Sequence, residues 1–164
     1  MDRTKNILFV GLGGQGILKA SEICATALFR HGYLVKQTEV HGMSQRGGSV
    51  TSEVRFGRVV YSPLIPLDAV DFLVALHAVE GERTRPLLRP GGLFLSIADC
   101  LDVAVGPDLM ANTVMLGRLA AHLDVPVETW LAAIAECVRP KFVAPNRHSF
   151  DLGLAFERRR QENV

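Results

Sequence analysis

A glycine-rich segment between an apolar run and a longer amphipathic stretch constrains this fold more than any other feature. Asn6–Val10 is apolar enough for a buried strand, and the residues from Gln15 to about His31 have apolar side chains near helical spacing. Between them lies Gly11-Leu12-Gly13-Gly14-Gln15-Gly16, which fits the pattern G-x-G-x-x-G. Glycines permit a tight turn and let backbone N–H groups approach an anion at the helix N-terminus. The segment predicts an α/β fold, and its turn either binds a phosphate group or is purely structural.

The remaining pattern predicts one domain over residues 1–164, of a length usual for a single domain. Tyr33–Val40 predicts a strand that completes a parallel crossover, and Ser49–Phe56 alternates as a strand does. Val59–Tyr61 follows so closely that it predicts a hairpin and hence a mixed sheet. Further strands are expected at 71–76 and 93–97, and helices at 79–88, 109–123 and 127–138. The predicted fold is therefore a three-layer, Rossmann-like domain with a mixed, mostly parallel sheet and a helical C-terminal portion.

Composition excludes several classes of function. Lys and Arg number 18 against 17 Asp and Glu, and a net charge of +1 argues against a general nucleic-acid binder. The three cysteines, Cys24, Cys100 and Cys137, are too scattered for an iron–sulfur cluster or a disulfide framework in this chain alone. No apolar run is long enough to cross a membrane, and the first residues lack a signal-peptide cleavage site. We expect a cytoplasmic protein that contacts neither nucleic acid nor membrane.

The second candidate segment is Glu39-Val40-His41-Gly42-Met43-Ser44-Gln45-Arg46-Gly47-Gly48. It follows a predicted strand, at the sheet edge where ligands collect in open α/β folds. Glu39 stands where a nicotinamide site would place its ribose-binding acid, and Arg46 offers a planar fork for carboxylate or phosphate. The predicted binding residues are Gly11, Gly13, Gly14, Gln15, Gly16, Glu39, His41, Ser44, Gln45, Arg46, Gly47 and Gly48, on one common surface. No catalytic or metal-ligating residue is predicted.

Four other residues are expected to have structural roles. His77 follows a strand and is expected to be a hydrogen-bonded structural histidine. Trp130 is expected in the core or at a subunit contact, and Gly117 within a helix indicates close helix packing. Asn146, just after Pro145, is expected to cap the next helix or to contact a partner.

The combination of the two glycine-bearing motifs resembles the gamma subunit or domain of 2-oxoacid:ferredoxin oxidoreductases. Gly-Leu-Gly-Gly-Gln-Gly at 11–16 and His-Gly-Met-Ser-Gln-Arg-Gly-Gly at 41–48 carry the likeness, with Val54-Arg55-Phe56-Gly57 after them. It continues through Leu88-Arg89-Pro90-Gly91-Gly92 and Met115-Leu116-Gly117 to Asn146, Phe150 and Gly153. Within this family the chain is most similar to the small (beta) subunit of indolepyruvate ferredoxin oxidoreductase.

The resemblance implies a part in the oxidative decarboxylation of a 2-oxoacid to acyl-CoA and carbon dioxide, with electrons passed to ferredoxin. It implies that thiamine diphosphate, magnesium and the iron–sulfur clusters reside on a large catalytic subunit, so this chain alone binds no cofactor and is inactive. We expect the glycine turn and Ser44–Gly48 to meet that subunit or the phosphates of coenzyme A. Ferredoxin would be an indirect partner.

Two alternatives stay open at the level of sequence. The first is a stand-alone Rossmann-like protein that binds a nucleotide or coenzyme A through the glycine turn. The second is a homodimeric scaffold in which that turn is only structural, and an isolated subunit could form a homodimer as well. A complete nicotinamide dehydrogenase is disfavoured, because 164 residues leave no room for a substrate domain.

Overall fold

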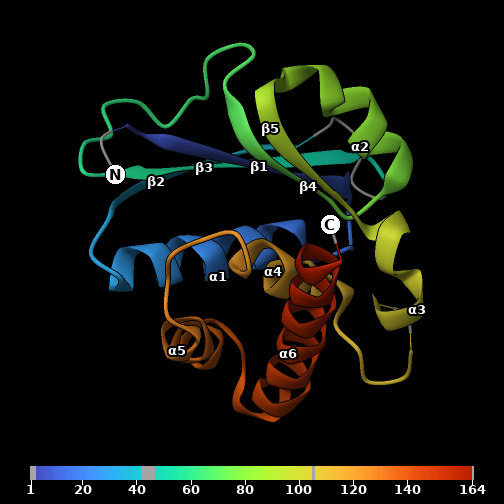
Figure 1. The fold of residues 1–164 in the computed structure, drawn as a ribbon. Coiled ribbons are helices and arrows are strands. Elements are labelled where there is room, and N and C mark those ends of the chain that lie inside the picture. Colours follow the sequence, from blue (N-terminus) through green and yellow to red (C-terminus); the bar gives the residue numbers. More distant parts are fainter. Residues whose placement is uncertain (1–2, 42–46, 105, 164) are drawn as a thin grey trace.

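The computed structural model describes residues 3–41, 47–104 and 106–163. The chain folds as an α/β domain with a five-stranded mixed sheet and a set of helices towards the C-terminus (Figure 1). The strands are β1 (Lys5–Leu12), β2 (Leu34–His41), β3 (Ser49–Gly57), β4 (Val70–Ala75) and β5 (Leu88–Ser96). The helices are α1 (Ile17–Arg30), α2 (Ala78–Thr84), α3 (Leu101–Ala104), α4 (Ala111–Ala120), α5 (Val127–Cys137) and α6 (Pro140–Glu162).

The sheet is mixed because β3 runs against its neighbours. The strand order is β2-β3-β1-β4-β5, and β3 pairs antiparallel with both β1 and β2. The pairs β1–β4 and β4–β5 are parallel, so β1, β2, β4 and β5 all point the same way. The expected crossover from β1 through α1 to β2 therefore exists, but β3 lies between its two strands. A mixed sheet was expected, whereas the pairing that makes it mixed was not.

The predicted hairpin between Ser49–Phe56 and Val59–Tyr61 is wrong. Residues 58–69 form an irregular connection, and the antiparallel partners of β3 are β2 and β1. The strand of residues 49–57 pairs along its length with a strand on each side. This pairing gives far more backbone hydrogen bonds than a three-residue hairpin strand could. A second difference concerns Pro90-Gly91-Gly92, expected as a turn, because β5 runs through these residues with an irregularity in its register against β4.

The two faces of the sheet bury different amounts of apolar surface. Alternating residues of β1 point to opposite sides, so Ile7 and Phe9 join the large core under α1, α4, α5 and α6, whereas Leu8 and Val10 join a smaller cluster beside α2. Figure 1 shows α1, α4, α5 and α6 on one side of the sheet and α2 on the other. Helices thus lie on both faces of the sheet, but the C-terminal helices bury much more apolar surface on one face than α2 does on the other.

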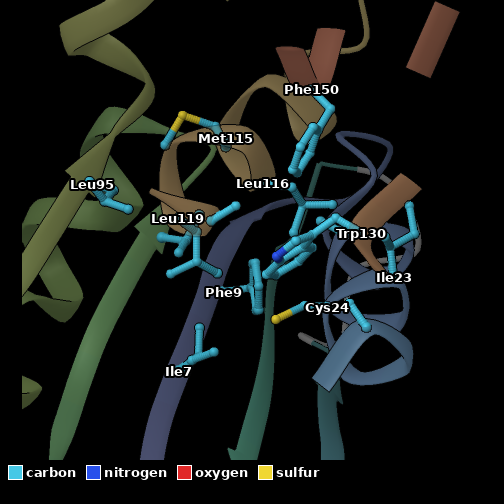
Figure 2. Close-up of a cluster of buried hydrophobic side chains, with 14 of the residues drawn as sticks. Ile7, Phe9, Ile23, Cys24, Leu95, Met115, Leu116, Leu119, Trp130 and Phe150 are labelled. Atoms are coloured by element: carbon cyan, nitrogen blue, oxygen red, sulfur yellow. The ribbon is translucent and has the colours of Figure 1, made fainter. Parts of the chain in front are cut away.

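The large core is centred on aromatic and branched side chains of β1 and of the helices α4, α5 and α6. Phe9 of β1 and Leu116 of α4 meet Trp130 of α5, and Phe150 of α6 lies beside them (Figure 2). The rings of Trp130 and Phe150 are 5.9 Å apart between centroids, a usual distance for an aromatic pair. Trp130 is fully buried, which confirms the expectation of a core residue.

Helices α4 and α6 touch through their backbones. A Cβ added to Gly117 would lie 2.1 Å from the carbonyl oxygen of Phe150, and one added to Gly153 would lie 1.9 Å from that of Val114. The close packing expected at Gly117 is therefore confirmed. Pro145, expected before a helix, lies inside α6 instead. Asn146 Nδ2 donates to the carbonyl of Phe142 (2.8 Å), so its side chain bonds within the helix rather than capping it.

Candidate functional site

The glycine turn joins the end of β1 to the start of α1. Gly14 and Gly16 have φ angles of 93° and 77°, in the left-handed region that other residues rarely adopt. Gly16 is also the residue before α1, and a Cβ there would lie 2.6 Å from the side-chain nitrogen of Asn112. Both glycines are thus required by backbone geometry, whatever the turn binds.

Three backbone N–H groups of the turn donate within the protein, and that of Gln15 donates to the carbonyl of Leu12 (3.2 Å). The amide of Leu12 donates to the side-chain oxygen of Gln15 (2.7 Å), which folds back over the turn. The amide of Gly13 donates to the carbonyl of Gly48 (2.9 Å), and a Cβ on Gly13 would lie 3.6 Å from the nitrogen of Gly47. The structure therefore brings the turn and Gly47–Gly48 into contact on one rim. Ser44, Gln45 and Arg46 lie outside the described residues.

Side chains of α2 hold the start of β3 through hydrogen bonds to Ser49. The Ser49 hydroxyl donates to a carboxylate oxygen of Glu80 (2.7 Å) and accepts from Arg83 (2.9 Å), and Arg83 also pairs with Glu80 (2.6 Å). The hydrogen bond from Ser49, opposed by partial burial and helped by Arg83, lowers the pKa of Glu80. Sequence reasoning missed this cluster, since only the pairing of β3 with β1 brings residues 49 and 80 together.

His77 caps the start of α2 and has the structural role expected of it. It is the residue before the first turn, and its Nδ1 accepts from the amide of Glu80 (3.4 Å). This bond satisfies one of the free N–H groups that every helix start carries.

Glu39 and His41 lie farther from the turn than a nicotinamide site would place them. Both belong to β2, an edge strand of the sheet, and Glu39 pairs with Ser52 of β3, which in turn pairs with Phe9 of β1. Two strand spacings, about 10 Å, separate β2 from β1. The acid of a dinucleotide site normally stands on the strand next to the glycine turn, and here β3 occupies that place.

The glycine turn separates two hollows. The larger, about 570 Å³, lies at the carboxyl ends of β1, β4 and β5, where α1 and α2 depart to opposite faces. Its lining is mainly apolar, with polar groups from three residues, and consists of Gly14, Gln15, Leu76, His77, Ala78, Val79, Ile97, Ala98, Leu101, Leu109, Met110, Ala111 and Asn112. The smaller, about 440 Å³, lies against the start of α1 and includes Lys19. Such a crevice at the strand ends is the usual ligand position in open α/β sheets.

The described part of the chain lacks a side-chain cluster suited to a metal ion or an iron–sulfur cluster. Within residues 3–41, 47–104 and 106–163 no three His, Cys, Asp or Glu side chains are grouped so that they could hold a metal ion. Cys24 and Cys100 are buried separately, and their donor set does not fit an iron–sulfur cluster. Over the same ranges, no helix is long and apolar enough to cross a membrane.

Comparison with known proteins defines the class to which this fold and rim belong. Residues 6–100 match the family model described as pyruvate ferredoxin/flavodoxin oxidoreductase. The chain belongs to this family.

Its relatives define the kind of subunit more narrowly. The chain is 45% identical to the indolepyruvate oxidoreductase subunit IorB of Thermococcus kodakarensis, over 91% of this chain and 94% of that one. It is 32% identical to the subunit of the same name from Pyrococcus horikoshii, with the same coverage. The protein is a gamma-type subunit of a 2-oxoacid:ferredoxin oxidoreductase, and the resemblance seen in its two motifs is confirmed.

Solved structures share the fold. The gamma subunit of a keto/oxoacid ferredoxin oxidoreductase from Geobacter sulfurreducens is 26% identical, with a TM-score of 0.75 over 93% of this chain and 98% of that one. A 2-oxoglutarate:ferredoxin oxidoreductase from Magnetococcus marinus, determined with 2-oxoglutarate, coenzyme A and succinyl-CoA bound, is 20% identical with a TM-score of 0.80. The match covers 96% of this chain and 32% of that longer one. The same fold thus occurs both as a separate chain and within a larger polypeptide.

Proposed function

We propose that this chain is the small subunit of an indolepyruvate-type 2-oxoacid:ferredoxin oxidoreductase. The observation that carries the proposal is the 45% identity to an indolepyruvate oxidoreductase subunit over nearly the whole of both chains. The holoenzyme would convert a 2-oxoacid and coenzyme A to acyl-CoA, carbon dioxide and a proton, and two electrons would pass to ferredoxin. Thiamine diphosphate, magnesium and the iron–sulfur clusters are assigned to the catalytic subunit.

The rim formed by the glycine turn and Gly47–Gly48 is the part of this chain proposed to face the active site or coenzyme A. Support comes from the bond between Gly13 and Gly48, and from the crevice at the strand ends. The amino end of α1 favours an anion. Lys19 also lines the smaller hollow, but its ammonium pairs with Glu22 and donates to the carbonyl of Cys137 (2.9 Å). Ser44, Gln45 and Arg46 are proposed to add hydroxyl, amide and guanidinium contacts to the same anion.

A nicotinamide dinucleotide is a weaker candidate for the rim. The N–H groups of Leu12 and Gly13 are already bonded to Gln15 and Gly48, and Glu39 lies on β2, two strand spacings from β1 and its turn. The parallel β1–β4–β5 part and the helices on both faces do support the description of the domain as a three-layer, Rossmann-like fold.

The proposal is tested by co-expressing the chain with its catalytic subunit and assaying reduction of ferredoxin. We expect kcat/KM to be higher with indolepyruvate than with pyruvate or 2-oxoglutarate. A holoenzyme that prefers 2-oxoglutarate, or a chain that does not associate with the catalytic subunit, would contradict the proposal.

The contribution of the rim is tested separately with Arg46→Ala in the assembled enzyme. We expect turnover to fall or the KM for coenzyme A to rise severalfold, since a guanidinium–phosphate pair is lost. Arg159→Ala, at an exposed position of α6, is the matched control and should leave both constants unchanged. Equal kinetics and equal assembly for the two variants would exclude the anion contact.

A further inference from the structure

Side chains of α2 reach the rim from the face of the sheet opposite α1. Odd-numbered side chains of β3 point to that face, since the even-numbered Val50 and Val54 belong to the large core. Ser49, the first residue of β3, therefore points to the side on which Figure 1 shows α2. Its hydroxyl donates to Glu80 (2.7 Å) and accepts from Arg83 (2.9 Å). We call Ser49, Glu80 and Arg83 the α2–β3 tether.

The tether acts on the backbone that closes the rim. Ser49 directly follows Gly48, whose carbonyl accepts from the amide of Gly13 (2.9 Å). Gly47 has a φ angle of 69°, which residues with side chains rarely adopt, so the backbone just before the tether has no side chain of its own to hold it. The position of Gly48 is therefore set from two sides, by Gly13 at its carbonyl and by α2 through Ser49.

Glu80 also belongs to the first turn of α2, which forms a wall of the larger hollow. The amide of Glu80 donates to His77 Nδ1 (3.4 Å), and His77 and the two residues after it line that hollow. The helix lies close against β4, because a Cβ added to Gly81 would be 2.6 Å from the Cβ of Ala75. Glu80 thus joins the hollow to the rim, by its backbone on one side and by its carboxylate on the other.

The charges of the tether cancel, which suits a position beside an anion. A lone carboxylate next to the rim would repel a phosphate group. Arg83 pairs with Glu80 at 2.6 Å and removes this repulsion. The carboxylate side chain is only 13% exposed, whereas that of Arg83 is 61% exposed. The part of the tether that faces solvent is therefore the positive one.

We propose that Glu80 is a positioning residue for the binding of coenzyme A. Through Ser49 it holds Gly47–Gly48 against the glycine turn and so keeps the backbone of the rim in the arrangement that receives the phosphates. The inference rests on the proposed contact of the rim with coenzyme A. In this role Glu80 touches neither the ligand nor the reacting atoms. Its loss should therefore raise the KM for coenzyme A and leave kcat and the KM for the 2-oxoacid unchanged.

The first test is steady-state kinetics of the assembled enzyme with Ser49→Ala in this chain. The variant breaks the tether without changing a charge, and the backbone pairing of β3 with β1, which places residue 49 opposite Leu12, does not depend on the hydroxyl. We expect the KM for coenzyme A to rise severalfold. Ser49→Thr keeps a hydroxyl and a side chain that strands favour, so it should restore a KM close to that of the wild type.

A second variant breaks the tether from the side of α2. Glu80→Ala/Arg83→Ala removes both charges together, so the net charge is kept and the KM for coenzyme A should rise as it does in Ser49→Ala. Combining all three substitutions should raise the KM no further, because they break the same contact. The matched control is Glu82→Ala/Arg85→Ala, another pair three residues apart with side chains 62% and 57% exposed, which should leave the KM unchanged.

Amide hydrogen exchange of the full chain tests the tether without coenzyme A. The amide of Gly13 is bonded to Gly48, so it should exchange severalfold faster in Ser49→Ala than in the wild type. The amide of Leu76, which donates to the carbonyl of Val10 (2.8 Å), is the internal control and should exchange at the same rate in both.

The outcomes separate this inference from the proposed function. An unchanged exchange rate at Gly13 would overturn the positioning role of Glu80 and leave the proposed function intact. The same holds if Arg46→Ala raises the KM for coenzyme A while Ser49→Ala does not, or if Ser49→Ala lowers kcat without raising that KM. If neither Arg46→Ala nor Ser49→Ala changes the kinetics, the contact of the rim with coenzyme A is refuted together with the positioning role.

Discussion

Replacing Gly117 with Ala tests the close contact of α4 with α6. The added Cβ would lie 2.1 Å from the carbonyl oxygen of Phe150 and 2.7 Å from the amide nitrogen of Leu154, whereas real Cβ contacts are essentially never under 3.0 Å. Both neighbours are backbone atoms of one helix, so no side-chain rotation can relieve the overlap. The helices would have to separate by about 1 Å, which removes a quarter to half of the dispersion attraction at each contact.

Helix propensity alone predicts the opposite sign. An Ala in a helix interior is favoured over Gly by about 1 kcal/mol, so without the contact Gly117→Ala would stabilise the protein. Overpacking of a tight core usually costs about 1–3 kcal/mol, and a backbone clash belongs at or above the upper end. We expect a net loss of about 2–3 kcal/mol in the free energy of unfolding, or a fall in Tm of roughly 5–10 °C for a domain of this size.

Thermal and urea unfolding of the isolated subunit, followed by circular dichroism, measures this change. Ala155→Gly, at an exposed position of α6, is the control, because it reports helix propensity without a contact and should cost about 1 kcal/mol. A Gly117→Ala variant as stable as the wild type, or more stable, would refute the argument from backbone contact.

Three further predictions concern buried groups. Burial tends to raise the pKa of Glu157, but hydrogen bonds from His122 and Arg118 outweigh it and lower the pKa from 4.5 to about 2. The resulting stabilisation, about 3 kcal/mol, is complete above about pH 4.5 and is lost as the pH falls towards 2. The variant Glu157→Gln should therefore be less stable than the wild type at pH 7, and its free energy of unfolding in urea should depend less on pH in this range. Burial raises the pKa of the Cys24 thiol, which is fully enclosed, so a thiol reagent should modify it only as the protein unfolds; rapid native-state labelling would contradict this. Trp130 Nε1 has no hydrogen-bond partner among the described residues, so Trp130→Phe removes an unsatisfied buried donor while the smaller ring leaves a cavity. We expect the two effects to offset to within about 1 kcal/mol in the free energy of unfolding, and a loss above about 3 kcal/mol would contradict this.

The glycine turn shows how a local motif can be predicted well while its use is not. The sequence places Gly11–Gly16 between a strand and a helix, and the positive φ angles of Gly14 and Gly16 explain why glycine is needed. A nucleotide fold would leave the free N–H groups of such a turn to a phosphate. Here Gln15 and Gly48 take two of them, and neither bond has a signature in the spacing of residues.

The Glu157 network is another feature that only three dimensions reveal. Arg118 is 1% exposed, donates to Glu157 at 2.7 Å and reaches the carbonyl of Ser96 at 2.6 Å. In the sequence, Glu157 stands beside a run of arginines and is typical of a solvated helix end. The crossing of α4 and α6 at Gly117 and Gly153 brings Arg118 and Glu157 together, so their burial follows from the packing of these helices.

The sequence by itself determined the elements whose signals are local, together with the family. Apolar periodicity and glycine placement are enough for β1, α1, β3 and β4, because hydrogen bonds and side-chain faces within each element repeat over a few residues. Only the tertiary structure decided which strands pair, that β3 lies between β1 and β2, that Pro145 sits within α6, and that residues 58–69 form a loop with its apolar side chains outward. These outcomes depend on contacts between residues far apart in the chain, where the burial of apolar surface and the pairing of backbone groups outweigh local preference.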